Sequence, residues 1–312
     1  MCGICGLFQS NQPVEEATLK RMSDRIAHRG PDDSGMYFSP DGRAGLGFRR
    51  LAIIDLSPTG HQPMTNEDGR LWIVFNGEIY NYPDLRKELA RAGHEFRSTS
   101  DTEVVIHGYE EWGAGVLSRL RGMFAFALWD ERNHALFAAR DRLGIKPLHY
   151  YWDGERFAFA SEIKALLTLP RLKTDLDHSA IWDYFTYLYV PTPKTVYKFI
   201  RKLPPAHYLT FRITGGADSP VRPFGEPESS PREIKQYWDV TRWGNSTLSR
   251  ADAADAVREK LRETVQAHLI ADVPVGVLLS GGLDSSAVTA FASPELQTSN
   301  FKLQTSNFKL QT

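Results

Sequence analysis

Met1-Cys2-Gly3-Ile4-Cys5-Gly6 is the stretch that decides the fold, because a thiol at the second position can become the N-terminus of the chain. Removal of Met1 would leave Cys2 with a free α-amine beside its thiol. An α-amine titrates at about pH 8 and a thiol at about pH 8.5, so one residue can supply both base and nucleophile at neutral pH. A small buried cysteine ahead of a strand is the alternative interpretation, and the rest of the sequence must decide between the two.

The composition is ordinary for a soluble globular protein and argues against several kinds of partner. Of the 312 residues, 42% are hydrophobic and 24% are charged, and a chain of this length is expected to form two domains. The formal net charge is −1 without a long basic block, and no apolar run approaches the roughly 18 residues of a membrane span. We therefore expect small-molecule partners, and neither nucleic acid nor a membrane.

Cys2 and Cys5 are the only cysteines in the chain. Two thiols so close in sequence cannot build a disulfide framework, and no second CxxC completes a zinc site, so no metal held by protein side chains is predicted. The low cysteine usage and the absence of a signal-peptide pattern predict a reducing, cytoplasmic location. A removed signal peptide would also be incompatible with Cys2 as an N-terminal nucleophile.

The first 160 residues combine many short strands with a few helices. Strands are predicted at 3–9, 45–50, 71–75, 124–129, 135–140, 148–152 and 157–160. Helices are predicted at 14–27, 83–92 and 102–112, the last one opened by the capping box Ser100-x-x-Glu103. The entirely apolar run 71–75 is typical of a strand covered on both faces, and it leads into Asn76-Gly77-Glu78. Strands this closely spaced favour an α+β fold with packed antiparallel sheets.

The second half begins after a stretch rich in Gly, Pro and Ser, residues 213–235, which has the composition of a linker between domains. A helix is predicted at 249–269 and a buried strand at 273–279. That strand runs into Ser280-Gly281-Gly282-Leu283-Asp284-Ser285, and another helix follows. Strand, glycine-rich turn and helix together make a phosphate cradle, because backbone N–H groups and a helix N-terminus both attract an anion. It is not a Walker loop, since no Gly-Lys-Ser/Thr follows at that spacing.

The last residues repeat one heptapeptide. Residues 296–302 recur identically at 303–309, and a third copy begins at 310. The fourth position of each repeat is serine, so there is no second apolar seam of the kind that a coiled coil needs. We interpret residues 294–312 as an aberrant segment that arose from a frame or assembly error.

Several motifs together resemble a known enzyme family. Residues 280–285 resemble the PP-loop of ATP pyrophosphatases, which split ATP into AMP and pyrophosphate. The first half resembles class II glutamine amidotransferases, the N-terminal-nucleophile glutaminases, in its residues 1–4, 28–32, 50–55, 76–81 and 100–101. With both halves considered, residues 1–293 resemble glutamine-dependent asparagine synthetases, and residues 122–127 and 140–148 strengthen the match.

The resemblance implies catalytic roles for three residues. Cys2 would attack the side-chain amide of glutamine, while the side-chain amide of Asn76 and the backbone N–H of Gly77 would stabilise the oxyanion. Solvated strand-end or helix-end charges are the alternative for the charged residues of the implied glutamine site. That site consists of Arg50, Leu51, Ile53, Asn76, Gly77, Glu78 and Asp101.

The two charged ends of glutamine need opposite partners. Arg50 would clamp the α-carboxylate with its planar guanidinium group, and Glu78 and Asp101 would receive the α-ammonium. In the second half the resemblance implies an ATP site, with Mg²⁺ bound to the ATP phosphates. The implied ATP-binding residues are Leu278, Leu279, Ser280, Gly281, Gly282, Asp284 and Ser285. The turn 140–147 is interpreted as packing rather than as a site.

The implied fold is a four-layer αββα N-terminal-nucleophile hydrolase domain followed by the start of an α/β, Rossmann-like PP-loop domain. The corresponding ranges are 1–212 for the glutaminase domain with its extension, 213–235 for the linker, 236–293 for the N-terminal part of the PP-loop domain, and 294–312 for the repeat. A homodimer is one candidate assembly.

The implied reaction converts glutamine, aspartate and ATP into asparagine, glutamate, AMP and pyrophosphate. Two alternatives stay open: a related amidotransferase with another acceptor, as in β-lactam synthetases, and a non-catalytic regulatory or vestigial fragment. Since only one strand is predicted after residue 236, we expect a truncated chain in which the glutaminase half alone is complete.

Overall fold

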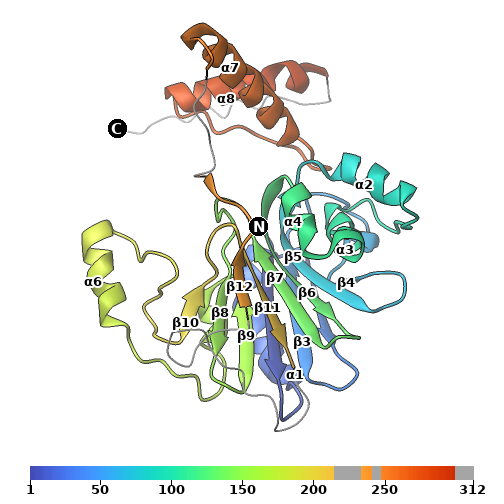
Figure 1. The fold of residues 1–312 in the computed structure, drawn as a ribbon, viewed down its shortest axis with the longest axis vertical. Helices are drawn as coiled ribbons and strands as arrows, with labels where there is room; N and C mark the ends of the chain where they lie inside the picture. The colour runs from blue at the N-terminus through green and yellow to red at the C-terminus, as the bar shows by residue number, and fades with distance from the viewer. Residues whose placement is uncertain (214–232, 241–246, 299–312) are drawn as a thin grey trace. The chain divides into compact units, whose positions relative to one another are not determined.

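The computed structural model describes residues 1–213, 233–240 and 247–298 (Figure 1). The chain divides into two compact units, Met1–Arg242 and Trp243–Thr312, and each is described by itself. In the described residues, no helix is both long and apolar enough to cross a membrane. The repeat at residues 299–312 lies outside the described residues.

The first unit contains two antiparallel six-stranded sheets. One has the strand order β10-β8-β9-β1-β3-β2. Its strands are β1 (Gly3–Gln9), β2 (Asp33–Phe38), β3 (Ala44–Arg50), β8 (His149–Trp152), β9 (Arg156–Ala160) and β10 (Ile200–Lys202). β1 is central because it pairs with β3 on one side and with β9 on the other, with Cys5 opposite Gly47 and Ala160. The residue just before β1 is therefore anchored by the middle of a sheet.

The other sheet has the order β12-β11-β7-β6-β5-β4. Its strands are β4 (Met64–Thr65), β5 (Leu71–Ile79), β6 (Gly122–Asp130), β7 (Ala135–Arg140), β11 (His207–Arg212) and β12 (Glu233–Gln236). β5 and β6 pair along their whole length, with Gly77 opposite Phe124. β12 pairs with β11, so residues 233–236, which the sequence assigned to the linker and the second domain, extend this sheet. The rest of the expected linker, residues 214–232, lies outside the described residues.

The two sheets pack face to face and helices cover their outer faces (Figure 1). Ile4, Phe8 and Phe48 from one sheet share a buried core with Val74 and Trp129 from the other, and the rings of Phe8 and Trp129 are 5.3 Å apart. Helices α1 (Glu16–Asp24) and α5 (Ile163–Leu166) cover the first sheet. Helices α2 (Tyr82–Arg91), α3 (Asp101–Trp112) and α4 (Val116–Arg119) cover the second. This arrangement confirms the α+β class and the four-layer αββα architecture.

Three local predictions needed correction. The helix expected at 14–27 is shorter, because α1 ends at Asp24 and a 3-10 turn, Ala27–Arg29, follows it. β5 continues through Asn76, Gly77 and Glu78 to Ile79 instead of ending at residue 75. Ser100 caps α3 by accepting from the Thr102 N–H, as expected. However, the Glu103 carboxylate accepts from the N–H groups of Arg97 and Ser98 and so does not complete a capping box.

Two helices make up the described part of the second unit. They are α7 (Arg250–Ala267), capped by the Ser249 side chain, and α8 (Leu283–Thr298). The buried strand predicted at 273–279 is wrong, because these residues are irregular and Leu278 is 95% exposed. A parallel strand needs hydrogen-bonded neighbours, and the described residues of this unit provide none. The helix expected after the glycines forms and starts at Leu283.

Candidate active site

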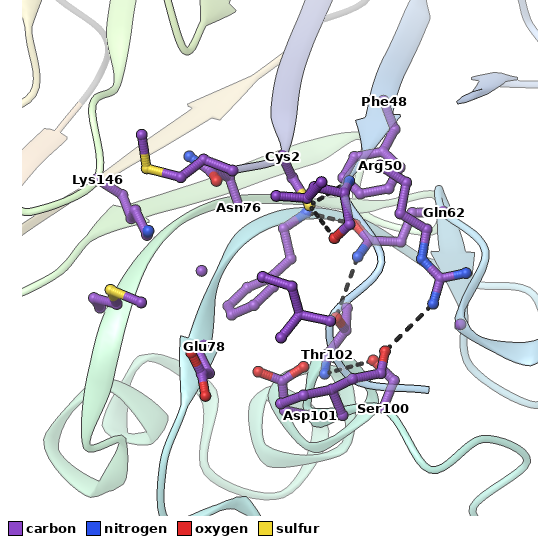
Figure 2. A pocket seen from close by; sticks show the side chains of 18 residues that line it. Cys2, Phe48, Arg50, Gln62, Asn76, Glu78, Ser100, Asp101, Thr102 and Lys146 are labelled. Carbon is purple, nitrogen blue, oxygen red and sulfur yellow. Dashed lines mark hydrogen bonds between the residues drawn. The ribbon is translucent and has the colours of Figure 1, made fainter. Parts of the chain in front are cut away.

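Residues from several separate segments line one pocket of the first unit (Figure 2). Cys2 lies just before β1, Arg50 ends β3, Glu78 lies near the end of β5, and Asp101 opens α3. Lys146 comes from the turn before β8. The pocket therefore brings together every residue of the expected glutamine site: Cys2, Arg50, Leu51, Ile53, Asn76, Gly77, Glu78 and Asp101.

The Cys2 thiol lies against the backbone that follows β3. Its Sγ is 3.4 Å from the Leu51 nitrogen, whose N–H donates to it, and 3.6 Å from the Leu51 carbonyl oxygen. Arg29 Nε donates to the Cys2 carbonyl at 2.9 Å, and this guanidinium also pairs with Glu162 at 2.9 Å. The Cys2 backbone is thus held by Arg29, which lies outside the expected site and is itself held by its ion pair with Glu162.

Burial acts in opposite directions on the thiol and on the amine beside it. It raises the pKa of the Cys2 thiol and lowers the pKa of the Met1 α-ammonium. A thiol with a raised pKa needs a base to become a thiolate, and an amine with a lowered pKa gives up its proton more readily. The second thiol, Cys5, is completely buried, and desolvation raises its pKa to about 12, which fits a spectator.

The Asn76 side chain is buried with its amide unsatisfied. Only 1% of Asn76 is exposed, and neither its Nδ2 nor its Oδ1 has a hydrogen-bonding partner among the described residues. A buried amide left unsatisfied costs free energy, so such a group in a pocket wall is poised for a ligand.

The Gly77 N–H points to the same edge of β5 as its neighbours at alternate positions. N–H groups alternate between the two edges of a strand. Phe75 N–H donates to Gln62 Oε1 at 2.7 Å, and Ile79 N–H donates to Asp101 Oδ2 at 2.8 Å. No side chain in the described residues accepts from the Gly77 N–H that lies between them. A Cβ on Gly77 would come within 2.3 Å of the Met123 carbonyl oxygen, so the close approach of β6 requires glycine here.

Arg50 brings a buried positive charge to the pocket. Its guanidinium donates to the carbonyl oxygens of Ile54, Asp55 and Ser57, at 3.4 Å for Ile54 and 3.3 Å for Ser57. The ion pairs of the described residues do not include Arg50, and only 7% of the residue is exposed. Carbonyl dipoles orient the group without neutralising it, so the charge remains available to an anion.

Glu78 and Asp101 form the acidic part of the same pocket (Figure 2). Burial and the neighbouring Asp101 raise the pKa of Glu78 to about 7. Burial raises the pKa of Asp101 to about 6, against the opposing effect of the hydrogen bond from the Ile79 N–H. Two carboxyls that resist ionisation side by side are the arrangement that a bound cation would stabilise.

Comparison with known proteins shows the family to which the chain belongs. A family model described as a glutamine amidotransferase domain matches residues 1–220, and one described as asparagine synthase matches residues 256–311. The chain belongs to the glutamine amidotransferase family. Its first unit is the amidotransferase domain, and the pocket around Cys2 lies within it.

Two curated relatives from one organism are named as glutamine-hydrolysing asparagine synthetases. The amidotransferase chain is 42% identical over 298 residues to asparagine synthetase (glutamine-hydrolyzing) 3 of Bacillus subtilis, an alignment covering 94% of this chain and 45% of the relative. It is 38% identical over 305 residues to asparagine synthetase (glutamine-hydrolyzing) 1 of the same organism, covering 96% and 45%. The chain spans about half the length of these curated relatives.

A solved structure supports the fold. Glutamine phosphoribosylpyrophosphate amidotransferase from B. subtilis superposes with a TM-score of 0.50 at 20% identity, covering 68% of this chain and 47% of the other. At this identity the likeness concerns the architecture alone.

Lys146 is a pocket residue that the sequence analysis did not identify. Residues 140–147 do form a packed turn: the Asp141 carboxylate accepts from the Ile145 and Lys146 N–H groups, and Arg140 Nε donates to the Lys146 carbonyl. The Lys146 side chain nevertheless lines the amidotransferase pocket. Burial, and then the positive charge of Arg29, lower the pKa of its ammonium, while Cys2 and Glu78 act in the opposite direction. Its place in a structural turn hid it from sequence reasoning.

The expected ATP-binding residues lie at the start of α8, in the second unit. Ser280 Oγ and Ser285 Oγ are 3.0 Å apart, and Gly281 adopts φ +80°, a conformation that favours glycine. Gly282 belongs to the same glycine-rich turn, and Asp284 lies in the first turn of the helix. Leu278 and Leu279 are exposed rather than buried beside the loop. The turn itself forms, whereas the strand that should carry it does not.

Proposed function

We propose that the amidotransferase unit hydrolyses the side-chain amide of glutamine with Cys2 as the N-terminal nucleophile after Met1 has been removed. The observation that supports this most is the pocket itself. It combines a thiol, an unpartnered buried amide, a buried guanidinium and two carboxyls that resist ionisation. A free amino acid has the complementary set of groups: an amide, a carboxylate and an ammonium.

The chemistry proceeds in two balanced steps. The Cys2 α-amine takes the thiol proton, sulfur bonds to the amide carbon, and the oxyanion that forms is stabilised by Asn76 Nδ2–H and the Gly77 N–H. The C–N bond then breaks as the leaving nitrogen receives the proton from the α-ammonium, and ammonia departs from a γ-glutamyl thioester. Water adds to the thioester carbonyl, sulfur leaves and regains a proton, and glutamate is released.

The charged groups bind both charged ends of glutamine and so position its side-chain amide next to the Cys2 sulfur. Arg50 binds the α-carboxylate, while Glu78 and Asp101 bind the α-ammonium. Because all three are buried or partly buried, each pairing is desolvated and stronger than it would be in water. Leu51 and Ile53 complete the wall against the substrate chain.

The direct test is glutamate release by the full 312-residue chain. Cys2→Ala, and an N-terminal extension that survives processing, should each abolish it, because each removes the one-residue pair of nucleophile and base. Cys5→Ala is the matched control, since it removes the other thiol and should leave the rate unchanged. Glutamate release from a chain with a blocked N-terminus would refute the assignment.

For the second unit we propose that the Ser280 to Ser285 turn is the phosphate-binding part of the synthetase reaction for which the longer relatives are named. In that reaction ATP and Mg²⁺ would activate the side-chain carboxylate of aspartate, and ammonia from the first unit would give asparagine. Support comes from the asparagine synthase match and from the Ser280 to Ser285 turn. An acceptor other than aspartate is the competing assignment.

The described residues of the second unit supply no strand beside that turn. We therefore expect the 312-residue chain to release glutamate but to form no asparagine, even with free ammonia supplied. Ammonia-dependent release of pyrophosphate by the purified chain would contradict this. The same assay with other carboxylate acceptors tests their use.

We also propose a homodimer in a reducing, cytoplasmic setting. Helix α6 (His178–Tyr187) and the residues after it expose large apolar side chains, among them Trp182, Phe185 and Leu188. Apolar groups in such number favour an interface. Light scattering on the chain and on a Trp182→Ser, Phe185→Ser variant measures the mass, and identical monomeric masses would refute the dimer.

A further inference from the structure

A cluster of imidazoles and carboxylates lies beside helix α3, outside the glutamine pocket. Glu67, His94 and His107 each place one nitrogen or oxygen within 4.8 Å of the others. Glu67 follows β4, His94 follows α2, and His107 belongs to α3. The sequence analysis predicted no metal held by side chains because no second CxxC accompanies Cys2 and Cys5. Only the fold brings these three residues together.

His107 is buried with one ring nitrogen unpartnered. Only 1% of its side chain is exposed. Its Nδ1 is 3.0 Å from Glu110 Oε2, while Nε2 has no hydrogen-bonding partner in the part of the chain that the structure describes. Glu110 is itself held, because Asn66 Nδ2 donates to its other oxygen at 2.8 Å. When Nδ1–H donates to the carboxylate, the Nε2 lone pair points away from it, which is the arrangement that orients a histidine ligand toward a metal.

His107 Nε2 lies near two carboxylate oxygens, farther away than a hydrogen bond but close enough to share a metal ion. His107 Nε2 is 3.8 Å from Glu67 Oε1 and 3.7 Å from Glu103 Oε1, both longer than a hydrogen bond. Ligand atoms about 2.1 Å from a tetrahedral zinc ion are about 3.4 Å apart. We propose that Glu67, His94 and His107 bind a divalent transition-metal ion, and that zinc fits their chemistry best.

The charges around the cluster favour a cation. Glu103 and Glu111 lie beside the two histidines, and Glu111 Oε2 is 3.3 Å from His94 Nε2. Arg70, 3.7 Å from Glu110, and Arg97, whose guanidinium donates to the Glu67 carbonyl oxygen at 3.4 Å, bring opposing charges. Two imidazoles and a carboxylate are a ligand set that zinc accepts, with Glu103 or water in the fourth position.

The competing arrangement is a protonated His107. Burial lowers its pKa, but attraction to the Glu103 and Glu110 carboxylates outweighs burial and raises the pKa to about 9. A metal must displace that proton, and a ring that keeps it binds no metal.

The test is zinc binding by the full chain, carried out in a Cys2→Ala background so that the Cys2 thiol does not compete. After treatment with a chelator, the chain should take up one equivalent of Zn²⁺ in competition with a chromophoric chelator, and zinc should raise its Tm by several degrees. Glu67→Gln and His94→Gln, at partly exposed positions, should lower zinc affinity at least about 10-fold and abolish the rise in Tm. Glu110→Gln should lower it about 10- to 100-fold through loss of ring orientation.

His61→Gln is the matched control, because His61 pairs with Asp33 away from the cluster and should keep full affinity. Absence of stoichiometric zinc binding by the parent chain would overturn the proposal. Unchanged affinity in Glu67→Gln and His94→Gln would overturn it as well, because zinc would then be bound elsewhere. These readouts do not involve glutamine, so failure of the proposed glutaminase activity leaves them intact.

Discussion

Glutamine binding should weaken sharply as the pH falls, and Glu78 should be the main cause. The α-ammonium of glutamine gains from Glu78 only when that carboxyl is ionised. With a pKa of about 7, Glu78 is about nine-tenths ionised at pH 8 and about one-tenth ionised at pH 6. The dissociation constant should therefore rise about tenfold between these pH values. Asp101, with a pKa of about 6, is still about half ionised at pH 6 and adds only about a further factor of two.

Isothermal titration calorimetry of glutamine with the Cys2→Ala chain separates binding from hydrolysis. Glu78→Gln should bind more weakly at pH 8 and should retain only the roughly twofold change that comes from Asp101. Glu88→Gln is the matched control, because Glu88 pairs with Arg119 outside the pocket. Titration of the ligand itself is common to all chains and cancels in the comparison. A tenfold pH effect that survives in Glu78→Gln, or none in the parent, would refute the reasoning.

Three further changes test the rest of the pocket. Asn76→Ala should lower kcat for glutamate release about 10²- to 10³-fold with little change in KM, because its unpartnered amide acts on the oxyanion; a raised KM alone would contradict this. Arg50→Leu should raise KM by a factor that corresponds to about 2–5 kcal/mol, with circular dichroism to confirm folding; an unchanged KM would make Arg50 a structural residue. In the ligand-free chain, the stability linked to Glu78 is present below about pH 4.5 and is lost as the pH rises through about 7, since folding raises its pKa. Glu78→Gln should therefore raise Tm at pH 8 but not at pH 4, and equal shifts at both would be the contrary result.

Prediction from the sequence succeeded where the residues of a motif point to a single kind of chemistry. The Cys2 start and the Asn76-Gly77-Glu78 run identified the family, and apolar alternation placed most strands of both sheets. It failed where tertiary neighbours decide the outcome. Residues 273–279 are apolar enough for a strand, but a strand also needs neighbours to pair with.

The missed site residues share a physical reason. Lys146 belongs to a turn that the sequence analysis interpreted as packing, and only the folded chain brings its side chain to the pocket of Cys2. His107 and Glu67 are unremarkable in sequence because their proximity arises from packing of α3 against the chain after β4. A pattern in the sequence does not show which distant segments come together in the folded chain.

Because β1 lies in the middle of its sheet, the newly made chain cannot complete this sheet until strands much later in the sequence have been made. β1 emerges from the ribosome before one of its partners, β9, which consists of residues 156–160. The pocket also needs Lys146, so the chain must be made as far as residue 160 before Cys2 can act. Until then the apolar strand beside Cys2 lacks its cover and depends on slow, long-range pairing. A nascent chain should thus be unable to split glutamine, and ribosome-bound intermediates shorter than residue 160 should be inactive and prone to aggregate.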